Sequence, residues 1–232
     1  MQNALLPASL PSPTSTVAVS ERGSATRDRL LNAAAPIFAA KGYRAASTRE
    51  ICLAAGVNAA SIHYHFGDKA GLYREVLVAP VRGMAANATH FNQPGLSFEQ
   101  SMQILYAGLL APLRSADPRT AQIVRLHYRE FVEPSGVLGD LIPRTFAPHY
   151  QATLALVCRA LALANPDEDA QRLIFCLLGM AFDFYSSTEC VEAYAPGLLA
   201  SPAAIDTLVE RLVSYAGAIV AAERTRRGIR TK

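Results

Sequence analysis

Apolar residues recur at the spacing of an α-helix along most of this chain, and patterns typical of strands are scarce. The clearest case lies between residues 47 and 66, where a glycine separates two short apolar stripes. The stripes consist of Ile51, Ala54 and Ala55, followed by Ile62 and Phe66. Residues three and four apart share one face of a helix, and Gly56 suits the left-handed residue that ends one. The pattern predicts two short helices joined by a tight turn.

Polar residues mark the starts of these helices. Ser47 and Glu50 have the S-x-x-E spacing of a capping box, so we expect a helix from Thr48. Asn58 is a favourable N-cap for the second helix. In the helix before them, Pro36 interrupts an apolar face. We expect a bend there, because a proline inside a helix leaves a backbone carbonyl without its donor.

Helix signals continue to the C-terminus. Ser97 with Gln100 forms another capping box, and the Asn-Pro pair at 165–166 and the Ser-Pro pair at 201–202 are typical helix starts. The segments 165–184 and 205–220 are apolar over a wider face than one core contact requires. Two such helices suit a four-helix interface between two copies of the chain. An internal core would produce the same pattern.

Composition adds few constraints. The chain has 232 residues, of which 51% are hydrophobic, enough for one small N-terminal unit and one larger domain. Its longest apolar run, Leu173 to Phe182, is shorter than the roughly 20 residues that span a bilayer. The cysteines have no C-x-x-C spacing and sit among apolar neighbours: Cys52, Cys158, Cys176 and Cys190. We expect buried, reduced thiols in a cytoplasmic protein without membrane contact, with a redox sensor as the alternative.

Charge is concentrated around the predicted helix pair. The chain carries a net charge of +3, whereas the stretch from Arg22 to Arg74 holds eight basic and three acidic residues, an excess of five. An ordinary helical hairpin in a core would not explain this excess. A basic surface beside a helix that fits a DNA groove is typical of a protein that binds duplex DNA.

From Thr26 to Val78 the chain resembles the DNA-binding domain of TetR/AcrR-family transcriptional regulators. The matching residues are Phe38, Lys41-Gly42-Tyr43, Thr48, Ile51, Ala54, Gly56-Val57, Tyr64-His65-Phe66, Lys69 and Leu72-Tyr73. Residues 127–140, HYREFVEPSGVLGD, and the later FDFYSSTEC resemble the C-terminal domain of the CecR (CerR)-like branch. The resemblance implies an all-α fold: an N-terminal three-helix helix-turn-helix DNA-binding domain, and a larger helical domain for effector binding and dimerisation.

The expected domain limits follow. Residues 1–22 contain three prolines and many Ser and Thr, and no charged residue before Glu21, so we expect a disordered arm. Residues 23–76 would form the DNA-binding domain and residues 77–226 the ligand-binding and dimerisation domain. Residues 227–232 would form a basic tail, either a solvated helix end or a further phosphate contact.

The resemblance also implies a set of DNA contacts. They are Arg44, Thr48, Arg49, Asn58, Ala59, Ala60, Ser61, His63, Tyr64, His65 and Lys69. Thr48, Arg49 and Lys69 correspond to phosphate contacts of the family. The alanines at 59 and 60 can only touch a thymine methyl group or permit close approach. Direct reading of bases therefore falls to Ser61 and His63, the latter at a position where many relatives carry Tyr.

Effector contacts are expected where apolar side chains carry a polar group, although each of these residues also suits ordinary packing. The candidates are His127, Tyr128, Glu130, Phe131, Phe146, Tyr150, Asp183 and Tyr185. The predicted function is a repressor that binds a palindromic operator as a dimer and is released by a small molecule. One alternative is a small-molecule binder with a vestigial DNA-binding domain; another is an enzyme using His127, Glu130 or Asp183. We expect no catalysis, cofactor or metal site, since no corresponding motif is present.

Overall fold

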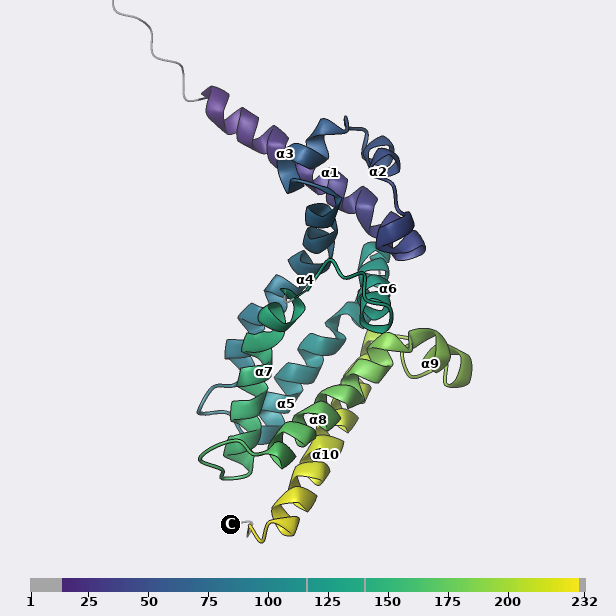
Figure 1. Ribbon diagram of the computed structural model, residues 1–232. Coiled ribbons are helices and arrows are strands. Elements are labelled where there is room, and N and C mark those ends of the chain that lie inside the picture. The colour runs from purple at the N-terminus through teal and green to yellow at the C-terminus, as the bar shows by residue number, and fades with distance from the viewer. Residues whose placement is uncertain (1–13, 116, 140, 230–232) are drawn as a thin grey trace, which may run out of the picture.

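The computed structural model describes residues 14–115, 117–139 and 141–229, and these ranges contain helices and no strand. The helices are α1 (Thr14–Ala45), α2 (Thr48–Ala55), α3 (Ala60–Phe66), α4 (Lys69–Phe91), α5 (Phe98–Leu110), the 3-10 helix η1 (Ala111–Arg114), α6 (Pro118–Val132), α7 (Leu141–Ala160), α8 (Glu168–Ser186), α9 (Thr188–Tyr194) and α10 (Pro202–Arg226). The all-α prediction is confirmed. Helices α1–α3 gather at one end of the molecule, and α5, α7, α8 and α10 form a long bundle at the other (Figure 1).

Two hydrophobic cores divide the molecule differently from the expected domain limits. The bundle core is built from α5, α7, α8 and α10 together with Phe91 at the end of α4. The second core joins α1–α3 and the start of α4 to Ile123 and Leu126 of α6 and to Leu138. A limit at residue 77 therefore does not separate the two cores, because α6 lies after it in sequence and packs with the helix-turn-helix.

Helix α1 departs from two expectations. It begins at Thr14, so residues 14–22 are helical and do not belong to a disordered arm; residues 1–13 lie outside the described residues. No proline follows Pro13 until Pro36, which lets the helix propagate from its packed part toward the N-terminus. Pro36 keeps helical dihedral angles, and the break in α1 lies instead at Gly42, with φ +72° and ψ 174°.

Helix starts follow the predicted signals in part. Ser97 and Gln100 form both bonds of a capping box, and Ser201 accepts a hydrogen bond from the backbone N–H of Ala204 at 3.1 Å. Helix α8 is capped by Asp167 and not by Asn165, because the Asp167 carboxylate accepts from the Ala170 N–H at 2.8 Å. The described cysteines are all free, and Cys176 and Cys190 are exposed, contrary to the expectation of burial.

Candidate nucleic-acid interface

Helix α2 begins at Thr48 as predicted, but without the capping box. The Ser47 side chain makes no capping bond, and the Glu50 carboxylate binds the Lys41 ammonium at 2.7 and 2.8 Å. Glu50 therefore joins α2 to the end of α1 and does not cap its own helix. At the other end, Gly56 adopts the left-handed conformation with φ 63° and ends α2 as expected.

The buried face of α2 differs by one position from the predicted stripe. Ile51, Cys52 and Ala55 are buried, whereas Ala54 is exposed. Leu53 is 82% exposed beside it. The inner face is thus set by packing on α1, and the sequence pattern did not distinguish Cys52 from Ala54 because both are small and apolar.

The first turn of α3 is held by Asn58. Its side-chain oxygen accepts hydrogen bonds from the Ser61 backbone N–H at 3.1 Å and from the Ser61 hydroxyl at 3.0 Å. Regular helix begins at Ala60 with Ala59 at the N-cap position, so the predicted N-cap Asn58 lies one residue earlier and still bonds the first turn. Because the Ser61 hydroxyl donates its proton to Asn58, it keeps only lone pairs for a DNA base. Ala59 and Ala60 are exposed next to it.

His63 is exposed, and its Nδ1 contacts the backbone carbonyl of Gly67 at the end of α3. A carbonyl oxygen can only accept, so Nδ1 carries the proton. In the neutral imidazole Nε2 is then an acceptor. Ser61 and His63 therefore both offer acceptors, which match the amino groups of adenine and cytosine in the major groove. Tyr64 is 83% exposed and meets the edge of the partly buried His65 at 4.8 Å between ring centroids.

Three of the eight basic residues counted between Arg22 and Arg74 form ion pairs in the described structure. Ion pairs join Arg27 to Glu75, Lys41 to Glu50 and Arg74 to Asp68. Arg44 and Arg49 are exposed and form no ion pair with any residue in the described ranges. Two of the cationic side chains without an ion pair therefore lie where α2 begins, next to Thr48.

Lys69, the first residue of α4, crosses to the link between α1 and α2. Its ammonium donates to the Arg44 carbonyl at 3.2 Å and lies 4.7 Å from the centroid of the Tyr43 ring. Partial burial lowers the pKa of Lys69. Lys69 therefore places α4 against the start of α2 and adds its charge to the surface around Arg44 and Arg49.

The described effector candidates differ in burial and in their contacts. Glu130 is buried and bonded to Tyr73, and His127 Nδ1 donates to the Ile123 carbonyl oxygen at 2.9 Å, while burial lowers the pKa of its imidazole. Tyr128, Phe131 and Phe146 are exposed. The remaining contacts are Phe131 with Phe182, Tyr150 with Phe175, and Asp183 with the Ser187 hydroxyl. The Tyr185 side chain lies outside the described residues.

The described surface includes open pockets, and two of them are defined by their lining residues. The larger, about 530 Å³, lies between the helix-turn-helix and the start of α7. It is lined by Arg27, His65, Phe66, Gly71, Arg74, Glu75, Val78 and Leu141. The smaller, about 290 Å³, is lined by Leu96, Phe98, Leu156, Arg159 and Ala160. Neither contains an effector candidate.

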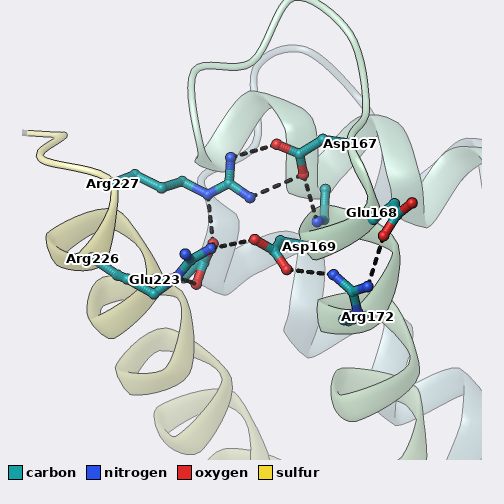
Figure 2. Close-up of polar contacts among 8 residues, drawn as sticks. Asp167, Glu168, Asp169, Arg172, Glu223, Arg226 and Arg227 are labelled. Carbon is teal, nitrogen blue, oxygen red and sulfur yellow. Dashed lines mark hydrogen bonds and ion pairs between the residues drawn. The ribbon is translucent and has the colours of Figure 1, made fainter.

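The C-terminal basic residues are engaged within the chain. Arg227 makes two bonds to the Asp167 carboxylate, at 2.6 and 2.9 Å, and Arg226 binds Asp169 at 2.6 Å and Glu223 at 2.7 Å (Figure 2). These contacts tie the end of α10 to the start of α8. Arg227 therefore does not belong to a free basic tail, and residues 230–232 lie outside the described part of the chain.

The described residues contain neither a cluster of metal-ligating side chains nor a single helix that could span a membrane. No three His, Cys, Asp or Glu side chains gather there in a way that could hold a metal ion. No single described helix is long and apolar enough to cross a bilayer. The segments Glu168–Phe184 and Thr188–Tyr194 together have the length and apolar composition of a span, but they are bent relative to each other.

Comparison with known proteins decides the family. Residues 30–76 match the model of bacterial regulatory proteins of the tetR family. Residues 98–222, more than half of the chain, match the model of the C-terminal domain of the HTH-type transcriptional dual regulator CecR. The chain belongs to the TetR family of transcriptional regulators. Its C-terminal part is of the CecR type, as the sequence predicted.

Individual TetR-family proteins share limited sequence identity with this chain or match only part of it. The regulator SrpR of Pseudomonas putida is 26% identical over 115 residues, which are 50% of this chain and 51% of SrpR. The match thus spans about half the length of that relative. The repressor KstR2 of Rhodococcus jostii is 41% identical over 54 residues, 23% of this chain and 26% of KstR2. The solved structure of FadR from Bacillus subtilis in complex with stearoyl-CoA has a TM-score of 0.61 at 12% identity, covering 81% of this chain and 97% of FadR.

Proposed function

We propose that this TetR-family chain is a ligand-responsive repressor that binds a palindromic DNA operator as a homodimer in the cytoplasm. The observation that carries the proposal is that two exposed arginines of the helix-turn-helix lack an acidic partner. Arg44 and Arg49 have no ion-pair partner in the described ranges and lie on either side of the start of α2, while Ala59 and Ala60 at the start of α3 are exposed. Guanidinium groups placed in this way contact phosphates while the first turn of α3 enters the groove.

The homodimer is supported by apolar side chains that remain exposed on the bundle. Phe175 and Phe182 of α8 are 69% and 41% exposed, and Tyr215 of α10 is 54% exposed. A second copy packed on α8 and α10 would cover them and set two recognition helices about 34–36 Å apart. Sedimentation of the purified protein tests the dimer, and a monomer at micromolar concentration would contradict it.

For the effector, we propose a small molecule that binds within the larger helical domain and lowers operator affinity by favouring another arrangement of the DNA-binding ends. The candidates Phe146, Tyr150 and Asp183 lie on α7 and α8, away from the helix-turn-helix. The fold shared with a regulator solved with stearoyl-CoA makes long-chain acyl thioesters the first compounds to test. A catalytic role for Glu130 is not favoured, since both carboxylate oxygens already accept hydrogen bonds from the protein.

Selection of bound fragments from the source genome tests the proposed function. We expect the protein to enrich palindromic duplexes, and the recovered operator to be released as salt rises. Acyl thioesters would then be added to the complex, with other compound classes screened in parallel. Enrichment of no sequence, combined with retention that does not depend on salt, would contradict a DNA-binding function and favour the vestigial alternative.

A further inference from the structure

A buried hydrogen-bonded junction joins α4 to α6. Glu130 of α6 is only 5% exposed, and its Oε2 accepts from the hydroxyl of Tyr73 at 2.7 Å. Its Oε1 accepts from the backbone N–H and the hydroxyl of Ser135, each at 3.0 Å. Tyr73 is 1% exposed and stands at the start of α4, directly after the helix-turn-helix. The buried charge of Glu130 is therefore stabilised by a donor from the DNA-binding end and by two from the segment after α6.

Neighbouring residues of α6 strengthen the attachment to α1. The guanidinium of Arg129 packs against the break in α1, where a Cβ added at Gly42 would come within 2.9 Å of its Cζ atom. Arg129 also reaches the Ala40 carbonyl at 3.5 Å. The left-handed Gly42 thus makes room for a side chain of α6. Ile123 and Leu126, on the same helix, are buried in the core that they share with the helix-turn-helix.

Contacts of α6 with α8 and α9 involve exposed side chains. Phe131 meets Phe182 of α8 at 5.5 Å between ring centroids, with the two side chains 73% and 41% exposed. Arg125 pairs with Glu189 of α9 at 2.9 Å, and both of these side chains are largely exposed. Solvent screens such an ion pair, so it restrains the helix weakly. Helix α6 is consequently tied more strongly to the DNA-binding end than to α8 and α9.

We propose that the bond from Tyr73 to Glu130 makes α6 part of the DNA-binding unit, and that Glu130 is a positioning residue for the recognition helix α3. The moving body would then be α1–α3, the start of α4 and α6 together. Glu130 would set how α3 is oriented relative to the bundle of α5, α7, α8 and α10, and hence the distance between the two α3 helices of a dimer. This inference rests on the proposed function, because it concerns binding to a two-fold operator.

The orientation of α3 relative to the bundle should affect binding to a full palindrome but not binding to a single half-site. A duplex with a single half-site contacts one DNA-binding unit, so its affinity does not depend on how the two units are oriented. In a full palindrome, the second unit binds within the same complex, and its effective concentration depends on the geometry that joins the two. Loosening the junction should therefore weaken binding to the full operator while leaving the half-site unaffected.

The variant Tyr73→Phe removes the bridging hydroxyl alone, and Tyr106→Phe is its matched control. Tyr106 is 0% exposed, and its hydroxyl donates to the Leu177 carbonyl at 3.0 Å entirely within the bundle. The probes are the palindromic duplex recovered from the genome and a duplex holding one of its halves. We expect Tyr73→Phe to lower full-site affinity about tenfold and half-site affinity less than about twofold, and Tyr106→Phe to change the ratio of the two affinities by less than about twofold.

Equal weakening of both duplexes by Tyr73→Phe would overturn the inference, since it would indicate general damage to the DNA-binding domain. An unchanged ratio of the two affinities would overturn it as well. In either case, specific binding by the wild-type protein would leave the proposed function standing.

A second measurement requires neither DNA nor a dimer. Spin labels are placed on α2 and α7 at the exposed positions Leu53 and Ala155, as Leu53→Cys and Ala155→Cys, in a chain with Cys176→Ser and Cys190→Ser. We expect Tyr73→Phe to broaden the distribution of distances between the two labels within one chain and Tyr106→Phe to leave it unchanged. A distribution that keeps its width in Tyr73→Phe would contradict the positioning role.

Discussion

The two ends of this molecule carry similar numbers of arginines and use them differently. At the helix-turn-helix, Arg44 and Arg49 are exposed without an ion pair in the described part of the chain. At the far end of the bundle, Arg226 and Arg227 each bind two carboxylate groups. A count of basic residues would assign both ends to DNA. The pairing of the charges distinguishes a surface that can meet phosphate from one that holds two helices together.

The far end is a closed network, which we call the ionic clasp. It consists of Asp167, Glu168, Asp169, Arg172, Glu223, Arg226 and Arg227 (Figure 2). Four acidic and three basic side chains leave it with a formal charge of −1, which disfavours phosphate. Asp167 also caps α8, so the same carboxylate starts one helix and binds the end of another. The clasp therefore sets the alignment of α8 with α10, the two helices proposed to form the dimer interface.

The largest effect is expected from removing the uncompensated charges. The double variant Arg44→Ala, Arg49→Ala should lower operator affinity by about 100-fold or more at about 0.1 M salt, because four phosphate contacts per dimer are lost. Titration of a labelled operator measures this change. Its control is Arg226→Ala, Arg227→Ala, which removes two arginines from the other end. Equal losses in the two variants would abolish the distinction between the ends.

A smaller effect is expected from the base-reading position. With Nδ1 bound to the Gly67 carbonyl, His63 offers an acceptor, so His63→Ala should reduce the preference for adenine or cytosine at one operator position by about tenfold. Competition between operators substituted at each position measures the preference. Lys69→Ala provides the contrast, since it should weaken all sequences alike. If His63→Ala does the same, His63 does not read a base.

The clasp should matter for stability while leaving DNA contacts intact. Arg227→Ala removes the contact between the end of α10 and Asp167, so we expect a lower Tm and operator affinity within about twofold of wild type. Differential scanning calorimetry and the same operator titration measure the two quantities. A loss of affinity with an unchanged Tm would place Arg227 at the DNA.

Acid should weaken the clasp over a defined range. The hydrogen bond from Arg226 lowers the pKa of Glu223 from 4.5 to about 2. A lowered pKa in the folded state stabilises the protein above about pH 4.5, and this stabilisation is lost as the pH falls toward about 2. We expect the difference in Tm between wild type and Glu223→Gln to be largest near neutral pH and to shrink over this interval. A difference independent of pH would exclude ionisation of Glu223 as its cause.

The sequence was sufficient where a signal and its partner are close together. Gly56 ends α2, Ser97 caps α5 and Asn58 holds the first turn of α3, each through groups within a few residues. Local chemistry determines such contacts. The wide apolar faces of the last helices and the family motifs were likewise enough to predict the all-α fold and the family.

Sequence reasoning failed where the partner is distant. Glu50 matches a capping box, but Lys41 on another helix binds it more favourably. Glu130 was predicted to contact a ligand, whereas in the structure it binds Tyr73, which lies 57 residues earlier in the chain. Periodicity cannot indicate such a pair, nor can it show that α6 packs with the DNA-binding core. The ionic clasp was missed for the same reason, since Arg227 and Asp167 are 60 residues apart.

The slope of log affinity against log salt concentration, measured for three proteins on one operator, tests the central distinction most directly. Under the proposed function, Arg44, Arg49 and Lys69 of two subunits would make six phosphate contacts, so the wild-type slope should be about −5. The slope should flatten to about −2 in the Arg44→Ala, Arg49→Ala variant and stay near −5 in Arg226→Ala, Arg227→Ala. A wild-type slope retained in the first variant, or a flattened slope in the second, would contradict the assignment of DNA binding to the unpaired arginines.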